Sequence, residues 1–285
     1  MPVSAKKFFK ECKGGRMYGA MLGDMIGAPH EFDETFKTKD FPLFDPKYTF
    51  TDDTVMTVAV AEALLSVPKD APVSDIEEAC RKSMHRWGNK HRWVGYGDRF
   101  GDWLDEGDDA KPYGSYGNGA AMRVTAAGWL YDTIERTREV ARATAAVSHN
   151  HPEGLKGAEA VAAVIFLART GAGKKEIREY VEREFGYDLS RSLEEIRPGY
   201  LMDETCQGTV PESVIAFLEG TGFEDTIRNV VSLGGDTDTT GAIAGSMAEA
   251  FYGVPEELKK ECRKRLDPEM IPVLEKFAEV TGIEV

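Results

Sequence analysis

The stretch SLGGDTDTTGAIAG, residues 232–245, places two carboxylates and three threonine hydroxyls directly before a run of very small side chains. A second stretch, YTFTDDTVMTVAVAEALL at residues 48–65, has Thr51, Asp52 and Asp53 at the start of a similarly apolar segment. A helix that is apolar on nearly every face lies in the interior of a protein. Both stretches therefore predict central helices whose first turns carry carboxylates into the core.

Helix capping is the simpler interpretation of either stretch alone, because Thr and Asp are preferred at helix N-termini. A cap needs one oxygen, whereas the two stretches supply four carboxylates, from Asp52, Asp53, Asp236 and Asp238. Four carboxylates that converge in a core repel one another unless cations lie between them. Oxygen ligands without Cys or His favour Mg²⁺, Mn²⁺ or Ca²⁺ over Zn²⁺, and two helix starts give room for two ions.

The remaining sequence indicates an all-α protein. Apolar residues recur at three- and four-residue steps, typical of helices, and alternating strand patterns are scarce. The periodic segments are residues 54–67, 74–87, 154–170, 174–186, 210–222 and 223–233. No Pro/Ser-rich linker or repeat divides the chain, so we expect one domain over residues 1–285. The longest segment without such a pattern, residues 95–118, is expected to be irregular.

A face of small residues runs along the expected helix at residues 241–253. Small side chains allow a second helix to approach closely. We therefore expect this face to help bring the two acidic helix starts together.

Charge argues against a broad nucleic-acid interface. The 285 residues include 49 acidic and 35 basic side chains, a formal net charge of −14, which is the wrong sign for holding a phosphate backbone. The longest strongly apolar stretch, residues 160–168, is too short to span a membrane. Asp24 interrupts the apolar segment that follows the basic N-terminal residues, which does not fit a signal peptide. We expect a cytoplasmic protein.

The cysteines indicate neither a zinc ribbon nor a secreted disulfide framework. No C-x-x-C pair is present, and the four residues are widely separated. They are Cys12, Cys80, Cys206 and Cys262. We expect them to be reduced and mostly buried.

Several blocks of the sequence resemble one enzyme family, in the order in which that family has them. They are GAMLGDMIGAPHEF at 19–32, TDDT at 51–54, GSYGNGAAMRV at 114–124, SHNHPEGLKGA at 148–158, TVPESVIAFL at 209–218 and LGGDTDTTGAIAG at 233–245. The family is that of the ADP-ribosylglycohydrolases, or ADP-ribosylhydrolases, which includes the dinitrogenase reductase activating glycohydrolase. The resemblance implies an all-α fold with two central Mg²⁺ or Mn²⁺ ions and hydrolysis of the bond between ADP-ribose and an acceptor.

The resemblance also implies which residues bind the ions. The implied metal ligands are Thr51, Asp52, Asp53, Asp236, Asp238 and Thr239, with Glu31 as a further acidic residue at the metals. It makes Glu31 the leading catalytic candidate, because the family uses this glutamate to activate the attacking water. Taken alone, Glu31 would be interpreted as a solvated acid after a Gly/Pro turn.

The segment YGSYGNG contains three glycines, which can bring backbone N–H groups within reach of a pyrophosphate. Taken alone it could be a surface turn, and its spacing is not that of a Rossmann fingerprint. The resemblance implies that it wraps the distal ribose and phosphates of ADP-ribose, with His149 near the phosphates. The predicted substrate-binding residues are Tyr113, Gly114, Ser115, Tyr116, Gly117, Asn118, Gly119 and His149. His149 and His151 could form a zinc pair, but no third ligand is apparent.

The acceptor preference depends on GYGDRFGDWLDEGDD, residues 95–109, where six carboxylates accompany Arg99. This segment is either a solvated acidic loop or one edge of the cleft. At the edge it would favour a cationic acceptor, because a carboxylate holds a guanidinium through two charged hydrogen bonds. Asp98 is the candidate for this catalytic contact, by likeness to arginine-specific relatives.

We therefore expect cleavage of ADP-ribose from modified protein side chains, with arginine favoured. The alternatives are hydrolysis of another conjugate such as O-acyl-ADP-ribose, or a non-catalytic ADP-ribose-binding protein. The acidic residues favour catalysis, because a structural protein has no physical reason to keep carboxylates that repel one another in its core.

Overall fold

The two stretches that open with carboxylates form buried helices in a computed structural model, which describes residues 17–282 except for the side chain of Asp108. Helix α2 spans Asp52–Leu65 and helix α13 spans Thr237–Tyr252. Thr51 caps α2, since its Oγ1 accepts a hydrogen bond from the backbone N–H of Asp53 at 3.4 Å. Helix α13 begins four residues before the range expected from sequence, so its acidic residues belong to the helix start itself.

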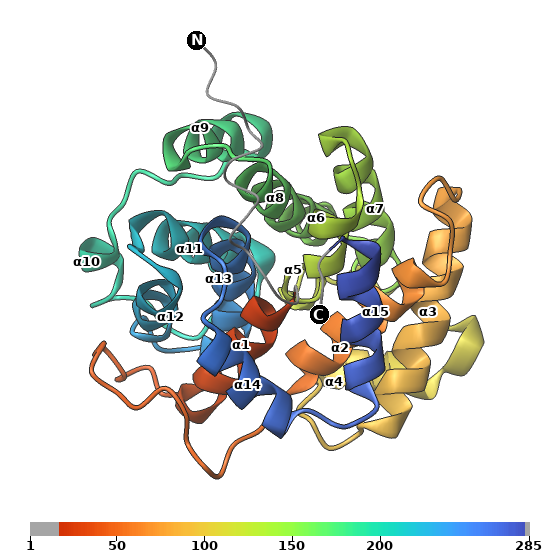
Figure 1. Cartoon of the computed structure of the whole chain (residues 1–285), viewed down its shortest axis with the longest axis horizontal. Coiled ribbons are helices and arrows are strands. Elements are labelled where there is room, and N and C mark those ends of the chain that lie inside the picture. Colours follow the sequence, from red (N-terminus) through yellow and green to blue (C-terminus); the bar gives the residue numbers. More distant parts are fainter. Residues whose placement is uncertain (1–16, 283–285) are drawn as a thin grey trace.

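Other helices surround α2 and α13, as Figure 1 shows. The N-terminal half contains α1 (Tyr18–Gly27), η2 (Ala28–His30), α3 (Val73–Lys90), α4 (Asp98–Asp105), η3 (Gly107–Asp109), α5 (Gly119–Met122), α6 (Thr125–Leu130) and α7 (Ile134–Ala146). The C-terminal half adds α8 (Pro152–Arg169), α9 (Lys174–Phe185), α10 (Leu193–Ile196), α11 (Cys206–Glu219), α12 (Phe223–Val231), α14 (Glu256–Arg265) and α15 (Met270–Val280). In residues 17–282 the only β-pairing is an isolated bridge between Gly117 and Thr205. The all-α prediction is confirmed.

The six periodic segments all form helices, but the expectation of an irregular segment at 95–118 is wrong in part. Residues within it form α4, because Phe100, Trp103 and Leu104 lie on one face and are buried. The charged residues around them make this short amphipathic pattern difficult to recognise in the sequence. The predicted acidic loop is therefore largely helical, and Asp98 is the first residue of α4.

The small-residue face of α13 packs against α1 and not against α2. The two helices run antiparallel and their backbones touch at three levels. A Cβ added to Gly23 would lie 1.9 Å from the carbonyl oxygen of Gly241, and one added to Gly27 would lie 2.1 Å from that of Thr237. This contact places the end of α1 beside the acidic start of α13. The close approach is as expected, but its partner is a different helix.

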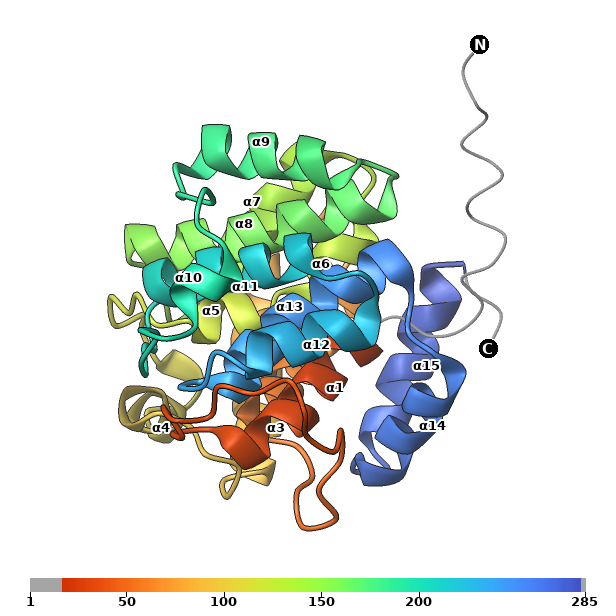
Figure 2. The ribbon, with the colours of Figure 1, turned by 90° about the vertical axis from the view of Figure 1, so that its left-hand side faces the viewer.

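The last two helices, α14 and α15, pack against α1 and α2. Helix α14 contacts α1 and α15 contacts α2, and Figure 2 shows them side by side along one edge of the molecule.

The cysteines that the structure describes are free and buried, as expected: Cys80, Cys206 and Cys262. Burial raises the pKa of the Cys80 and Cys206 thiols to about 12, which makes them poor nucleophiles. Cys12 and the basic residues within 6–16 lie outside the described range. Between residues 17 and 282, no helix has the length and apolar character needed to cross a bilayer.

Replacing Gly23 by alanine should destabilise the protein, because the added methyl group would meet the backbone of α13. We expect the free energy of unfolding to fall by about 1–3 kcal/mol or more, as for overpacked cores, when measured by urea denaturation. The matched control is Gly101→Ala in α4, where an added Cβ meets nothing within 4 Å. That variant should be neutral or slightly more stable. Equal stability of the two variants would contradict the packing described here.

Candidate active site

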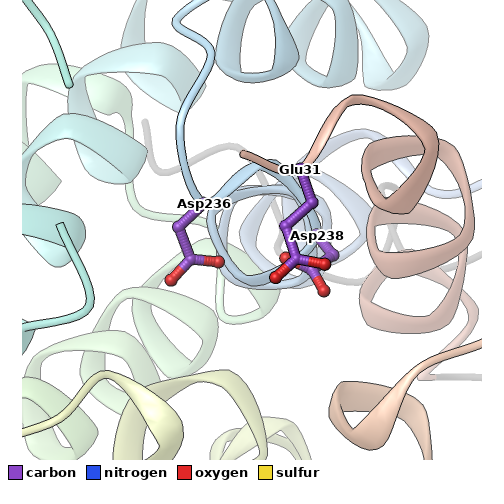
Figure 3. A group of neighbouring side chains, drawn as sticks. All are labelled: Glu31, Asp236 and Asp238. Atoms are coloured by element: carbon purple, nitrogen blue, oxygen red, sulfur yellow. The ribbon is translucent and has the colours of Figure 1, made fainter. Parts of the chain in front are cut away.

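Glu31 lies over the start of α13 because the chain turns back immediately after α1. The short helix η2 ends at His30, and the N–H of Phe32 donates to the carbonyl oxygen of Gly235 at 3.0 Å. One carboxylate oxygen from each of Glu31, Asp236 and Asp238 lies within 4.8 Å of the other two. Figure 3 shows the Glu31 and Asp238 carboxylates together with Asp236 beside them.

The start of α2 brings further carboxylates to the same cleft. Asp53 Oδ2 accepts a hydrogen bond from Thr239 Oγ1 at 3.2 Å, and Asp53 Oδ1 is buried without a partner. The cleft has a volume of about 520 Å³. Its acidic part is lined by Glu31, Asp52, Asp53, Asp236, Asp238 and Thr239. Six of the seven predicted metal-binding residues therefore face one space.

The seventh, Thr51, is engaged elsewhere. Its Oγ1 donates to Asp24 Oδ1 at 2.9 Å, and Asp24 also accepts from the N–H of Thr54 at 3.0 Å. Asp24 lies inside α1, fully buried. Sequence analysis missed it, although a lone Asp in an apolar helix was the available signal. Asp24 thereby ties α1 to the start of α2.

Burial and mutual repulsion shape the ionisation of this cluster. Burial, and then the charge on Asp238, raises the pKa of Asp52, Asp53 and Asp236 well above the usual aspartate range. The same causes raise the pKa of Glu31 to about 8 and that of Asp24 to about 7. A divalent cation would offset the repulsion. The all-oxygen donor set and the unpartnered Asp53 Oδ1 fit a hard cation such as Mg²⁺ or Mn²⁺.

The glycine-rich segment 113–119 forms another part of the cleft. It is held by two backbone hydrogen bonds to residues 204–206, where α11 begins. Asn118 N donates to Glu204 O at 2.8 Å, and Cys206 N donates to Tyr116 O at 2.9 Å. The predicted substrate-binding residues that line the cleft are Tyr113, Ser115, Gly117, Asn118, Gly119 and His149. Gly114 and Tyr116 do not. The exposed Tyr116 ring instead packs edge-on against His151, with ring centroids 5.3 Å apart.

Asn118, which was predicted to bind substrate, lines the cleft but uses its side-chain amide within the protein. Its side-chain Nδ2 donates to Asp236 Oδ2 at 2.6 Å and to Thr209 Oγ1 at 3.1 Å. Both hydrogens of the amide group are then occupied within the protein. Asn118 therefore orients an acidic residue of the cluster and joins the glycine-rich segment to it.

The two neighbouring histidines have separate roles. His151 caps α8, because its Nδ1 accepts from the N–H of Glu153 at 3.2 Å. This leaves no zinc pair with His149, which lines the cleft. Burial, followed by the charges of Arg123 and Arg99, lowers the pKa of His149 well below its usual value. Arg123 is a buried cleft residue that sequence analysis did not identify, although it belongs to the block at 114–124.

Asp98 lies at the start of α4, at the edge of the cleft. It also lines an adjoining open cavity of about 600 Å³, together with Trp93, Asp102 and Asp105. Gly95 and Tyr96 belong to both spaces. The acidic start of α4 therefore lies where the cleft and the adjoining cavity meet. The sequence alone did not decide between this position and a solvated loop.

The chain is similar in sequence to one protein family and to several known hydrolases. The model of the ADP-ribosylglycohydrolase family matches residues 13–282. ADP-ribosylhydrolase ARH3 of Mus musculus is 27% identical, over 87% of this chain and 86% of that protein. ADP-ribosyl-[dinitrogen reductase] glycohydrolase of Rhodospirillum rubrum is 25% identical over 89% and 93%. The ADP-ribosylarginine hydrolase Tri1 of Pseudomonas putida is 26% identical over 84% and 70%.

A solved structure has a similar fold. It is described as an ADP-ribosylglycohydrolase-related protein complex, with 25% sequence identity and a TM-score of 0.68. The alignment covers 94% of this chain and 98% of the other.

The acidic cluster predicts how stability depends on pH. Folding raises the pKa of Glu31 from 4.5 to about 8 and that of Asp24 from 3.8 to about 7, so protonation favours the folded state. The stability that these groups contribute is complete below their unfolded pKa values, 3.8 and 4.5, and is lost as pH rises from there through about 7 and 8. In EDTA the melting temperature should therefore fall over this range, measured by scanning calorimetry.

Saturating Mg²⁺ should reduce that fall and raise the melting temperature at pH 8, because cations bind the ionised carboxylates of the folded state. Asp238→Asn serves as the control, since the Asp238 charge raises both pKa values. It should flatten the pH dependence in EDTA and lose the response to Mg²⁺. Identical melting of the unaltered protein in EDTA and in Mg²⁺ would rule out the metal site.

Proposed function

The chain belongs to the ADP-ribosylglycohydrolase family and is a hydrolase of ADP-ribose conjugates, and we propose that it removes ADP-ribose from modified protein side chains, with arginine favoured. We further propose that two Mg²⁺ or Mn²⁺ ions are required, and that the enzyme is cytoplasmic. The observation that carries this proposal is one cleft that joins an acidic cluster to a glycine-rich segment.

The acidic part of the cleft supports metal-dependent hydrolysis. Glu31, Asp52, Asp53, Asp236, Asp238 and Thr239 would hold the ions. When bound, divalent cations make water more acidic at neutral pH and stabilise negative charge on oxygen. The family resemblance and the oxygen-only ligands support this assignment. The 520 Å³ cleft volume lies within the range usual for small-molecule sites.

Glu31 is suited to take a proton from the attacking water. It is half-buried above the start of α13, and its pKa is raised to about 8 by burial and by the charges of Asp238 and Asp52. A base works best when its pKa is near the working pH. Bound cations would lower this pKa and so favour the ionised form that accepts the proton. Asp236 is oriented by Asn118, which limits its freedom to move away from the cluster.

The glycine-rich segment supports binding of the ADP-ribose part. Glycine permits close approach of a ligand to the backbone, and Gly117 and Gly119 line the cleft beside His149. Arg99 stacks over the Tyr113 ring, with its Cζ 4.8 Å from the centroid. Positive charge here favours phosphates. The ions and the phosphates would then occupy different parts of one cleft.

Asp98 supports a cationic acceptor. It lies where the cleft meets the adjoining cavity, and Asp102 and Asp105 continue the acidic border. A guanidinium linked to the ribose could form two hydrogen bonds with the Asp98 carboxylate. The name of the Pseudomonas putida relative, an ADP-ribosylarginine hydrolase, accords with this acceptor.

The test is a panel of ADP-ribosyl-arginine, ADP-ribosyl-serine and O-acetyl-ADP-ribose substrates, each incubated with Mg²⁺ while free ADP-ribose is measured. The arginine conjugate should be cleaved fastest. Asp98→Asn should lower kcat/KM for it by about tenfold or more, because a hydrogen bond to a charged group contributes about 1.5–3 kcal/mol. The affinity for free ADP-ribose should not change.

Asp102→Asn is the matched control, since Asp102 lies on the same helix but lines only the adjoining cavity. It should leave the arginine preference intact. Equal or faster release from the serine conjugate would contradict the acceptor assignment, and release from none would contradict the hydrolase assignment.

A further inference from the structure

Arg123 is a buried charge with little compensation. Arg123 is 1% exposed, and no ion pair within residues 17–282 includes it. One guanidinium nitrogen, Nη2, donates to Ser148 Oγ at 2.7 Å, and Cζ lies 5.6 Å from the centroid of the Phe100 ring. The Nε–H has no hydrogen-bond partner. A charge that is buried without a carboxylate partner destabilises the folded state. Its hydrogen bond to Ser148 therefore indicates a functional role for this contact.

The hydrogen bonds determine which atom donates at each step. A guanidinium can only donate, so Ser148 Oγ accepts from Arg123. The single hydroxyl hydrogen of Ser148 is then available to its other neighbour, His149 Nδ1, at 2.8 Å. A hydroxyl oxygen can accept two hydrogen bonds, but if Nδ1–H also donated to it, the buried hydroxyl hydrogen would have no acceptor, because Ser148 Oγ has no third partner within residues 17–282. Nδ1 is therefore the unprotonated, accepting nitrogen. In a neutral imidazole the proton then lies on Nε2.

His149 is neutral in this setting. It is 5% exposed, and its burial together with the charges of Arg123 and Arg99 lowers its pKa well below the usual value. A second proton on the ring would also need Nδ1, which accepts from Ser148. One neutral tautomer is therefore favoured over the other and over the imidazolium.

The protonated nitrogen faces the glycine-rich segment. A Cβ added to Gly119 would lie 3.2 Å from His149 Nε2, and one added to Gly117 would lie 3.5 Å from it. All three residues line the cleft. The glycines therefore leave the Nε2–H uncovered, so it can donate to a ligand.

We propose that Arg123 and Ser148 form a relay that fixes His149 as the Nε2–H tautomer, so that His149 donates to an anionic oxygen of the bound nucleotide. Arg123 and Ser148 are positioning residues, because they act through His149. His149 in turn is a binding donor and does not accept the proton of the attacking water. This inference rests on the proposed function for the identity of the ligand, but the tautomer depends only on the protein.

The relay is tested by NMR of protein labelled with ¹⁵N-histidine, in which long-range ¹H–¹⁵N correlations distinguish protonated from unprotonated ring nitrogens. A His149→Gln variant assigns the signals among the five histidines. The unaltered protein should show His149 protonated at Nε2 only. Ser148→Ala should give a mixture of tautomers, and Ser148→Thr, which keeps the hydroxyl group, should restore the single form.

The affinity for free ADP-ribose, measured by calorimetry, distinguishes the positioning role of Ser148 from the direct contact of His149 with the ligand. Ser148→Ala should weaken binding by about tenfold, the loss expected for one hydrogen bond, and Ser148→Thr should recover most of it. Gly119→Ala should weaken binding while leaving His149 in the Nε2–H tautomer, because its methyl group would cover Nε2 but would meet neither Arg123 nor Ser148.

A proton on Nδ1 in the unaltered protein would overturn the relay, whatever happens to the variants. So would a Ser148→Ala protein with an unchanged tautomer and unchanged affinity. If the unaltered protein has the Nε2–H tautomer but does not bind ADP-ribose, the relay stands and the proposed ligand is wrong. The two failures are therefore distinguishable.

Discussion

The backbone contact between α1 and α13 is the constraint on which the site depends. Glycines face each other across it, and a Cβ on Gly19, Gly23 or Gly27 would lie within 2.2 Å of an α13 carbonyl oxygen. Because the helices are antiparallel, this contact brings the chain after α1 to the start of α13. Glu31 consequently lies beside Asp236 and Asp238. Asp24, one turn before the end of α1, holds the start of α2 through Thr51 and Thr54. A single close contact thus assembles carboxylates from three separate segments.

The assembled cleft has an acidic part and a part beside the glycine-rich segment, and a hydrogen bond connects the two. The carboxylates repel one another and have raised pKa values, a state that cations would relieve. Arg123, Arg99 and the neutral His149 lie by the glycine-rich segment, where they suit phosphate oxygens. Asn118 joins the two parts, because it belongs to the glycine-rich segment and donates to Asp236. A ligand that carries phosphates next to a ribose, as ADP-ribose does, can contact both parts at once.

Helical periodicity predicted the fold well, whereas side-chain partners were not predictable from sequence. The acidic starts of α2 and α13 were recognisable because carboxylates at the ends of two apolar helices need a special environment. Helix α4 was missed because its apolar residues are few and surrounded by charges. Asp24 and Arg123 were missed because their importance lies in contacts with residues 27 and 25 positions away. Similarly, nothing in the segment 113–119 shows that Asn118 turns its amide toward Asp236.

The central claim is that carboxylates from α2, α13 and the turn after α1 hold two divalent cations in one cleft. Electron paramagnetic resonance during a Mn²⁺ titration tests it most directly, because two ions in one site interact magnetically. The account predicts binding of two Mn²⁺ per chain with the spectrum of a spin-coupled pair, and loss of that spectrum in Asp238→Asn. Binding of no Mn²⁺, or only the signal of isolated ions, would contradict it.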